Sequence, residues 1–255
     1  MPPTVILIRH AQALHNVADN LYKLYGLSLT HLRDWQLRDP PLSELGFEQC
    51  KELREVLKTT LPGRLDPDLV IVSPMARTLQ TALASLDWLQ ETGVPFVAHA
   101  GWQETTDNPC DWGVEISEVS PSFPTVDFSK VDPIFPEKKA PEAKLYHFNR
   151  QALVTRAQTV LAELYARPEK VVAVVSHSAF LSKAVSGSMY HNADFRIFDF
   201  EEPVAADAAE AKSTAHPDLP PLVYRLRERD ETLKGRGGMG WSPDQVRNIG
   251  DELAD

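Results

Sequence analysis

The chain has 255 residues, of which 43% are hydrophobic and 24% are charged, so it can bury one sizeable core without disulfides. Its formal charge of −10, without a stripe of lysine or arginine, argues against nucleic acid as a partner. No run approaches the roughly 20 apolar residues that span a bilayer, and the amino terminus has no basic, cleavable leader. We therefore expect a cytoplasmic protein without a membrane partner.

The first predicted strand is the apolar, β-branched run of residues 4–8, which ends at Arg9 and His10. A buried strand of an α/β sheet has this composition. In open α/β sheets, ligands bind in the crevice beyond the carboxyl ends of the strands. We therefore expect Arg9 and His10 to lie at a ligand site.

The second predicted strand, residues 69–72, leads into a helix that carries an arginine near its start. Ser73 and Pro74 have the pattern of a helix cap and a first helical residue, and the apolar spacing continues to a stop near Gly93. Arg77 then lies in the first turn, where the helix dipole disfavours a cation. Because an anion bound at this end would offset that effect, Arg77 is a predicted anion contact.

The rest of the chain alternates helices and strands. Apolar residues at helical spacing predict helices after Ser43 and over residues 153–164. Residues 171–175 form a third apolar run, which is followed closely by His177. Residues 195–200 alternate like a strand with one exposed face, which we expect at the sheet edge. This alternation predicts an α/β fold, a three-layer α/β/α sandwich with a mostly parallel central sheet.

Inserted segments and a C-terminal extension complete the predicted organisation. We predict one α/β domain over residues 1–200, in which residues 17–41 and 105–148 are inserted lid segments, because long ordered connections often form lids or binding loops. Residues 201–255 are predicted to be a linker and C-terminal extension, partly flexible. The first part of this extension is rich in alanine, aspartate and proline and has little apolar periodicity.

Some charged and glycine-rich positions in these outer segments have a functional and a structural interpretation. The lysines of the second insertion either contact a distal anionic group or are solvated surface charges: Lys130, Lys138, Lys139 and Lys144. Most acidic residues there, among them Asp111, are expected to face solvent. Residues 222–226 are a candidate strand. Residues 235–240 lack the Gly-Lys-Ser/Thr ending of a phosphate-binding loop and are predicted to form a turn.

The residue types at the strand ends suit phosphate chemistry. A phosphate monoester repels a nucleophile unless fixed cations neutralise its oxygens, and arginine does so with a forked geometry. A neutral imidazole is a competent nucleophile toward phosphorus, and a phosphohistidine divides one difficult displacement into two easier steps. His10 is therefore the candidate nucleophile, attacking through one ring nitrogen while the other donates to a carbonyl. His177 would stabilise the charge of the transferred group.

Four segments resemble the histidine phosphatase superfamily, in its phosphoglycerate-mutase-like branch. They are Leu7 to His10, Pro41 to Gly46, Ser73 to Ala82 and Val175 to Ser178, and the resemblance covers roughly residues 4–200. In that family a histidine is phosphorylated, two arginines and a second histidine hold the phosphate, and an acidic residue protonates the leaving oxygen. The family's reaction uses no metal, and the resemblance implies no cofactor.

The resemblance gives each of these roles to a residue of this chain. Glu104 is implied as the acid, which later acts as a base on the incoming water, and Asn16 is implied as a phosphate contact. The implied site consists of His10, Glu104 and His177 as catalytic residues and Arg9, Arg77, Asn16 and Ser178 as phosphate-binding residues. Asn16 and Ser73 can equally be interpreted as turn and cap residues.

Two positions depart from the family's pattern. Ala11 stands where the family motif usually has glycine, and Ser178-Ala179 replaces a turn that usually contains glycine. The leading prediction is a phosphatase that hydrolyses a small-molecule phosphate monoester through a phosphohistidine on His10. Two alternatives stay open, namely a phosphoglycerate-type mutase and a repurposed or non-catalytic member that binds another ligand.

Overall fold

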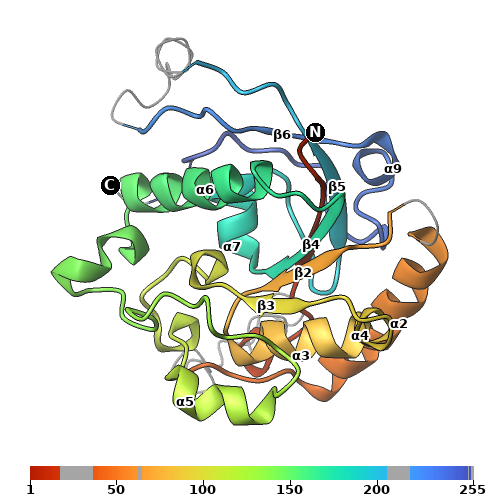
Figure 1. Cartoon of the computed structure of the whole chain (residues 1–255), viewed down its shortest axis with the longest axis horizontal. Coiled ribbons are helices and arrows are strands. Elements are labelled where there is room, and N and C mark those ends of the chain that lie inside the picture. The colour runs from red at the N-terminus through yellow and green to blue at the C-terminus, as the bar shows by residue number, and fades with distance from the viewer. Residues whose placement is uncertain (18–36, 62–64, 206–218, 252, 254–255) are drawn as a thin grey trace, which may run out of the picture.

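A six-stranded sheet organises the computed structural model, which describes residues 1–17, 37–61, 65–205, 219–251 and 253. Its strands are β1 (Thr4–Arg9), β2 (Leu69–Val72), β3 (Phe96–Ala98), β4 (Val171–Ser176), β5 (Phe195–Phe200) and β6 (Leu226–Glu228). The strand order is β3-β2-β4-β1-β5-β6 (Figure 1). The strands from β3 to β1 run parallel, whereas β5 and β6 are antiparallel to their neighbours. The mostly parallel central sheet is therefore confirmed.

The strands expected at residues 4–8, 69–72 and 171–175 correspond to β1, β2 and β4. Residues 195–200 also form a strand, but its expected position at the sheet edge was wrong. Strand β5 lies between β1 and β6 because the chain returns after residue 219 and pairs with its outer side. A central position explains why the first four residues of β5 are buried.

The helices lie on both faces of the sheet (Figure 1). They are α2 (Glu44–Thr60), α3 (Ala76–Ser85), α4 (Asp87–Glu91), α5 (Ile116–Val119), α6 (Arg150–Tyr165), α7 (Ser178–Phe180) and α9 (Asp230–Leu233). Shorter turns are η2 (Ala100–Trp102), η3 (Pro109–Asp111), η4 (Ser120–Ser122), η5 (Pro141–Tyr146) and the π-type η6 (Leu181–Val185). Within the described ranges, no helix combines the length and apolarity needed to cross a bilayer.

Of the two helix caps predicted from the sequence, the structure confirms one. The Ser43 hydroxyl accepts a hydrogen bond from the Gly46 N–H at 3.1 Å, so the predicted cap of α2 is confirmed. The predicted cap of α3 was wrong, because its N-cap is Met75 and the Ser73 hydroxyl bonds to His177 instead. A buried partner that follows another strand, His177, thus replaces the local helix cap. Arg77 still lies in the first turn of α3, as expected.

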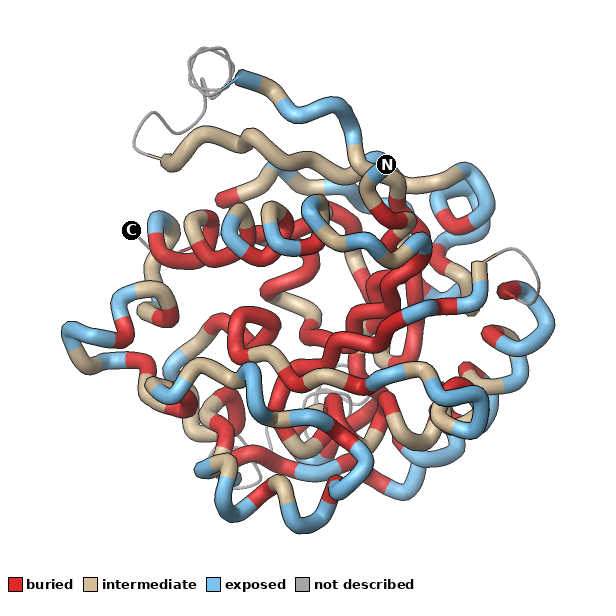
Figure 2. Tube along the Cα trace, viewed as in Figure 1, coloured by how far each residue is buried: buried red, intermediate tan, exposed pale blue. Residues whose placement is uncertain are grey.

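Alternate residues of β1 face two separate cores. Val5 and Leu7 pack against α6, α7 and η6, whereas Ile6 and Ile8 pack against α2, α3 and α4. Figure 2 shows these buried segments at the centre of the molecule, with exposed segments around them. Each fully buried aliphatic side chain contributes roughly 1.5–3 kcal/mol relative to exposure. The two cores confirm the three-layer α/β/α sandwich.

The structure describes the whole of the second predicted insertion but only the ends of the first. Residues 18–36 of the first insertion lie outside the described residues. The second, residues 105–148, contains η3, α5, η4 and η5 and passes the outer side of β3 (Figure 1), where Asp127 exchanges backbone hydrogen bonds with Phe96 and Ala98. Its function as a lid stays a prediction.

The C-terminal segment is joined to the sheet by buried polar contacts. Arg196 of β5 and Glu228 of β6 form an ion pair at 2.7 Å with both side chains almost fully buried. The Asp194 carboxylate accepts backbone N–H groups from Met239 and Ser242, and residues 235–240 form the predicted turn. The candidate strand at 222–226 begins only at Leu226. The domain boundary at residue 200 stays a prediction.

Candidate functional site

The site lies where the parallel strands β1, β2 and β4 end. Because their carboxyl ends meet at one edge of the sheet, the residues that follow them converge. His10 follows β1, Ser73 follows β2 and His177 follows β4. The ring centroids of His10 and His177 are 5.2 Å apart, and His177 Nε2 is 2.9 Å from Ser73 Oγ. The structure therefore brings the two predicted histidines together and adds a hydroxyl.

His10 is held in one tautomer by a backbone carbonyl. Its Nδ1 lies 2.7 Å from the carbonyl oxygen of Ala11, and because a carbonyl can only accept, Nδ1 carries the proton. Burial lowers the pKa of His10 well below 6.5, and the positive charges of Arg77 and Arg9 lower it further. The ring is therefore neutral at physiological pH and Nε2 has a free lone pair, as a nucleophile requires.

His177 is neutral for a similar reason. Its side chain is fully buried, and burial followed by the charge of Arg77 lowers its pKa well below 6.5. Nε2 shares a hydrogen bond with Ser73, and Nδ1 has no hydrogen-bond partner among the described residues. A buried imidazole nitrogen without a partner is costly unless a ligand supplies one.

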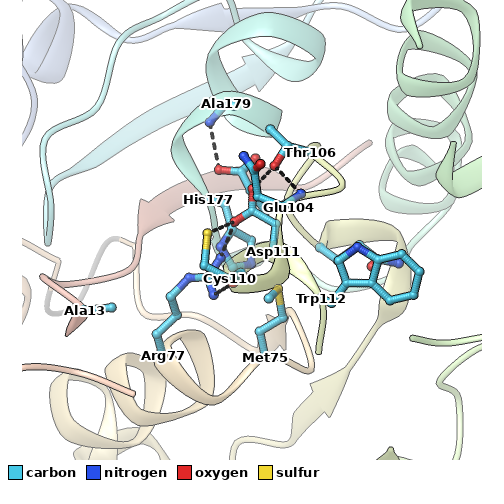
Figure 3. Close-up of polar contacts among 12 residues, drawn as sticks. Ala13, Met75, Arg77, Glu104, Thr106, Cys110, Asp111, Trp112, His177 and Ala179 are labelled. Carbon is cyan, nitrogen blue, oxygen red and sulfur yellow. Dashed lines mark hydrogen bonds and ion pairs between the residues drawn. The ribbon is translucent and has the colours of Figure 1, made fainter. Parts of the chain in front are cut away.

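The two arginines approach the histidines from different elements. Arg9, the last residue of β1, donates to the Tyr190 carbonyl at 2.9 Å. Arg77 is fully buried and donates through Nη1 to the Cys110 carbonyl at 2.8 Å and through Nη2 to Asp111 at 3.1 Å (Figure 3). Both guanidinium groups lie close enough to lower the pKa of His10.

Glu104 is buried beside the start of α7. One oxygen accepts the N–H of Ala179 at 3.2 Å (Figure 3). The other accepts the N–H groups of Phe180 and Thr105 at 3.0 and 2.9 Å. Burial raises its pKa, and the nearby charge of Asp111 raises it further, whereas the backbone donors and Arg77 oppose the change. The net direction favours a retained proton.

The structure gives Asn16 and Ser178 local contacts. The Asn16 side-chain oxygen accepts the N–H of Ala13 at 3.1 Å and the amide of Asn192 at 3.3 Å. The same Asn192 amide is 3.1 Å from the His10 carbonyl oxygen, so Asn16 lies beside the His10 backbone. Ser178 is the first residue of α7. Phosphate contacts by Asn16 and Ser178 stay predictions.

Alanine fits where the related motif has glycine. The Ala11 N–H donates to the Thr81 hydroxyl at 3.0 Å, and Ala11 is completely buried. Among the described non-glycine residues, only Asp39, Ala193 and Arg236 have positive φ. Ala11 therefore needs no left-handed backbone, and its methyl group introduces no backbone strain.

The sequence interpretation missed three residues whose side chains lie at or beside the candidate site. The His15 ring lies 5.9 Å from that of His10, and burial followed by Arg77 and Arg9 lowers its pKa to about 2. Asp111, expected in solvent, is buried against Arg77. Lys138, interpreted as a surface or substrate-facing lysine, is also buried. Nothing in the local pattern marks Asp111 or Lys138, whereas His15 could have been suspected from its closeness in sequence to His10.

Lys138 is enclosed by backbone carbonyls. Its ammonium lies 2.9, 3.1 and 2.6 Å from the carbonyl oxygens of Glu104, Thr106 and Asp111. Burial lowers its pKa to about 7, although three acceptors match the three N–H bonds of the charged form. This lysine therefore has no donor left for an anionic substrate group.

Potential metal ligands and the Cys110 thiol were further candidates for chemistry at the site. Among the described residues, no three histidine, cysteine or acidic side chains are grouped as metal ligands. Burial, followed by the charge of Asp111, raises the pKa of the Cys110 thiol to about 12. Because the thiolate is the nucleophilic form, Cys110 is inert at physiological pH.

The family of this chain is shown by a family model and by its relatives. Residues 5–202 match the family model described as Histidine phosphatase superfamily (branch 1). A probable phosphatase of Schizosaccharomyces pombe (strain 972 / ATCC 24843) is 30% identical over 178 residues, which cover 68% of this chain and 73% of that protein. Phosphoglycerate mutase-like protein 1 of Arabidopsis thaliana is 32% identical over 210 residues, covering 70% and 69%. The solved structure of Mycobacterial hydrolase 1 is 17% identical with a TM-score of 0.48, covering 90% and 97%.

Proposed function

Because this chain belongs to the histidine phosphatase superfamily, we propose that it hydrolyses a small-molecule phosphate monoester through a phosphohistidine on His10. One observation carries the proposal. The His10 proton is fixed on Nδ1 by the Ala11 carbonyl, so that Nε2 is unprotonated beside His177 and near two arginines. A nucleophile and the cations that neutralise a phosphoryl group are thus available together.

The first step transfers the phosphoryl group to the protein. His10 Nε2 forms a bond to phosphorus while the phosphorus–oxygen bond to the alcohol breaks, and the leaving oxygen takes a proton. Glu104 supplies that proton, since burial and Asp111 raise its pKa. Arg9, Arg77 and neutral His177 stabilise the charge on the phosphoryl oxygens.

The second step returns the protein to its starting state. Water attacks phosphorus, the bond to His10 Nε2 breaks, and Glu104 takes the water proton that it will supply in the next turnover. Inorganic phosphate leaves. No proton, electron or co-reactant beyond water is required.

A phosphoglycerate-type mutase is the second candidate, favoured by the similarity to Phosphoglycerate mutase-like protein 1 of Arabidopsis thaliana. A mutase must hold a second anionic group of its substrate. Lys138 is occupied by three carbonyls, and Lys139 pairs with Asp107 at 3.2 Å. The Lys139 pair is exposed and weak, but the three carbonyls leave Lys138 no donor for a second anionic group, which supports hydrolysis over transfer.

The test is release of inorganic phosphate from a panel of phosphate monoesters, with EDTA present, by the native protein and by His10→Ala. We expect release that falls more than about 10⁴-fold in the variant. His147→Ala is the matched control, because the His147 ring bonds to the Ala140 carbonyl and is not among the residues assigned to the reaction, so turnover should be unchanged. Rapid quenching should trap an acid-labile phosphoenzyme in the native protein alone.

Other outcomes separate the alternatives. Isomerisation of phosphoglycerate with little phosphate release would support the mutase. Absence of turnover on every ester, with ligand binding that His10→Ala leaves unchanged, would support a repurposed or non-catalytic member. Equal phosphate release by the native protein and His10→Ala would contradict the phosphohistidine step.

A further inference from the structure

The hydrogen bonds of the Arg77 guanidinium go to one short segment, residues 104–111, while Nη1 also lies 3.9 Å from Oδ1 of the buried Asp39. The two terminal nitrogens of Arg77 donate to the Cys110 carbonyl and to Asp111 Oδ1, at 2.8 and 3.1 Å. The second Asp111 oxygen accepts the Thr106 hydroxyl, so both oxygens of this carboxylate have partners (Figure 3). The Arg77 side chain is fully buried and that of Asp111 is 9% exposed. Water therefore competes little with this ion pair.

The same segment contains the acid Glu104. Lys138 binds the carbonyls of Glu104, Thr106 and Asp111, so one ammonium ties the beginning, middle and end of the segment together. A displacement of Asp111 would therefore disturb the backbone that carries Glu104. The segment of residues 104–111 therefore both holds the Arg77 guanidinium and carries the Glu104 carboxyl.

These contacts point to a function for Asp111 that the proposed reaction does not itself assign. We propose that Asp111 is a positioning residue, which fixes the Arg77 guanidinium beside the phosphoryl group and couples it to the acid Glu104. The inference rests on the proposed function, because it needs Arg77 and Glu104 to act on one phosphate ester. Asp111 need not touch the substrate.

The charges around Glu104 make the coupling measurable. The charged or titratable groups that face it are Asp111 and Cys110 of its own segment, Arg77 of α3, Lys138 of the second insertion and Arg156 of α6. Asp111 is the carboxylate of this set, and its charge raises the pKa of Glu104 after the larger effect of burial. Removal of that charge should release the Glu104 proton at lower pH.

A competing interpretation gives Asp111 the opposite effect. Its carboxylate occupies Arg77 Nη2, which could otherwise bind a phosphoryl oxygen, so Asp111 would hinder the substrate. Two variants separate these interpretations. Asp111→Asn keeps the shape and an acceptor oxygen for Arg77 but loses the charge, whereas Asp111→Ala loses both.

The experiment measures phosphate release against pH for the native protein, Asp111→Asn and Asp111→Ala. The basic limb of kcat/KM reports loss of the acid's proton, so in Asp111→Asn this limb should move to lower pH. In Asp111→Ala, loss of the Arg77 anchor should lower kcat/KM at neutral pH by about 100-fold, the usual result of misplacing a contact by about 1 Å. Asp107→Asn is the matched control, since Asp107 is exposed on the same segment and pairs with Lys139.

Binding of inorganic phosphate provides a measurement that does not depend on turnover. By calorimetry, Asp111→Ala should bind phosphate at least about tenfold more weakly than the native protein, and thermal melting should confirm that both variants fold. Equal or tighter binding, or a basic limb unmoved in Asp111→Asn, would overturn the positioning role. If the native protein binds phosphate but releases none from any ester, the hydrolytic function fails while the binding result still decides the role of Asp111.

Discussion

The two sides of the candidate site are built by different means. On one side, His10, Ser73 and His177 follow β1, β2 and β4, so the register of the sheet fixes where they lie. On the other side, Glu104 belongs to a segment without strands, which Lys138 and Arg77 hold by polar contacts. Strand ends are positioned by backbone pairing and apolar packing, whereas the segment depends on two buried cations.

This difference determines how each side should fail. Loss of a single side chain on the strand side removes its chemistry but leaves the backbone paired. Loss of a cation on the segment side removes chemistry and position together, because buried carbonyls and carboxylates lose their partners. Substitutions on the two sides should therefore separate turnover from local order.

Apart from loss of His10 itself, the largest effect is expected for Arg77→Lys, where the two sides meet. Lysine keeps the charge but lacks the fork that reaches the Cys110 carbonyl and Asp111 together. We expect kcat/KM for a phosphate monoester to fall about 10²- to 10³-fold. Arg54→Lys, at the ion pair with Asp87 far from the site, is the control. A loss of less than about threefold would show that a point charge suffices.

Lys138→Met should lower kcat/KM by roughly 10- to 100-fold. It should increase the local opening of residues 104–111 without affecting the strands on the other side of the site. Methionine fills the space but leaves three buried carbonyls without a donor, at about 1–3 kcal/mol each. Hydrogen exchange should therefore increase over residues 104–111 while β1 and β4 stay protected. Lys139→Met, whose exposed ammonium pairs with Asp107, should change neither measurement. Uniform loss of protection across the sheet would contradict the division into two sides.

The strand side should respond to acid through His15. Its pKa is about 2 in the folded protein against an ordinary 6.5, so below pH 6.5 the unfolded chain binds a proton that the folded one does not. Stability from this group is complete above 6.5 and falls with the pH; near pH 5 the loss is about 2 kcal/mol. Denaturant unfolding at neutral and acid pH should show this loss in the native protein and a smaller one in His15→Gln.

Asp39 provides an opposing contribution to the same titration. Burial raises its pKa to about 6, so the folded protein binds its proton more tightly and gains stability as the pH falls from 6 toward 4. Asp39 is present in both proteins, and its contribution cancels in their difference. Identical pH dependence in the native protein and His15→Gln would contradict a buried neutral His15.

The smallest effect is expected for Ser73→Ala. Its hydroxyl makes one neutral hydrogen bond to His177 at 2.9 Å, a contact that contributes about 0.5–1.5 kcal/mol. We expect a loss of about tenfold or less in kcat/KM, with hydrogen exchange unchanged. Ser85→Ala, whose hydroxyl bonds within α3, is the matched control. A loss comparable to that of Arg77→Lys would mean that Ser73 itself contacts the reacting group.

The same division explains what could be predicted from the sequence. Strands β1, β2 and β4 were evident because a short apolar run that ends in a polar motif is a local pattern. The cap of α3 was misplaced because Ser73 has a partner 104 positions along the chain. Asp111 and Lys138 were missed because burial of a charged side chain depends on partners that no local pattern reveals. The position of β5 depended on the return of the chain at β6.

The backbone hydrogen bonds that cover the outer sides of β3 and β5 have a consequence for solubility. Strand β3 is covered on its outer side by the backbone of Asp127, and β5 by β6. Unpaired strand edges are templates for association with other chains. Truncation before residue 226 would expose the outer side of β5, next to β1, and would remove Glu228 from the buried Arg196. Such a fragment should therefore aggregate.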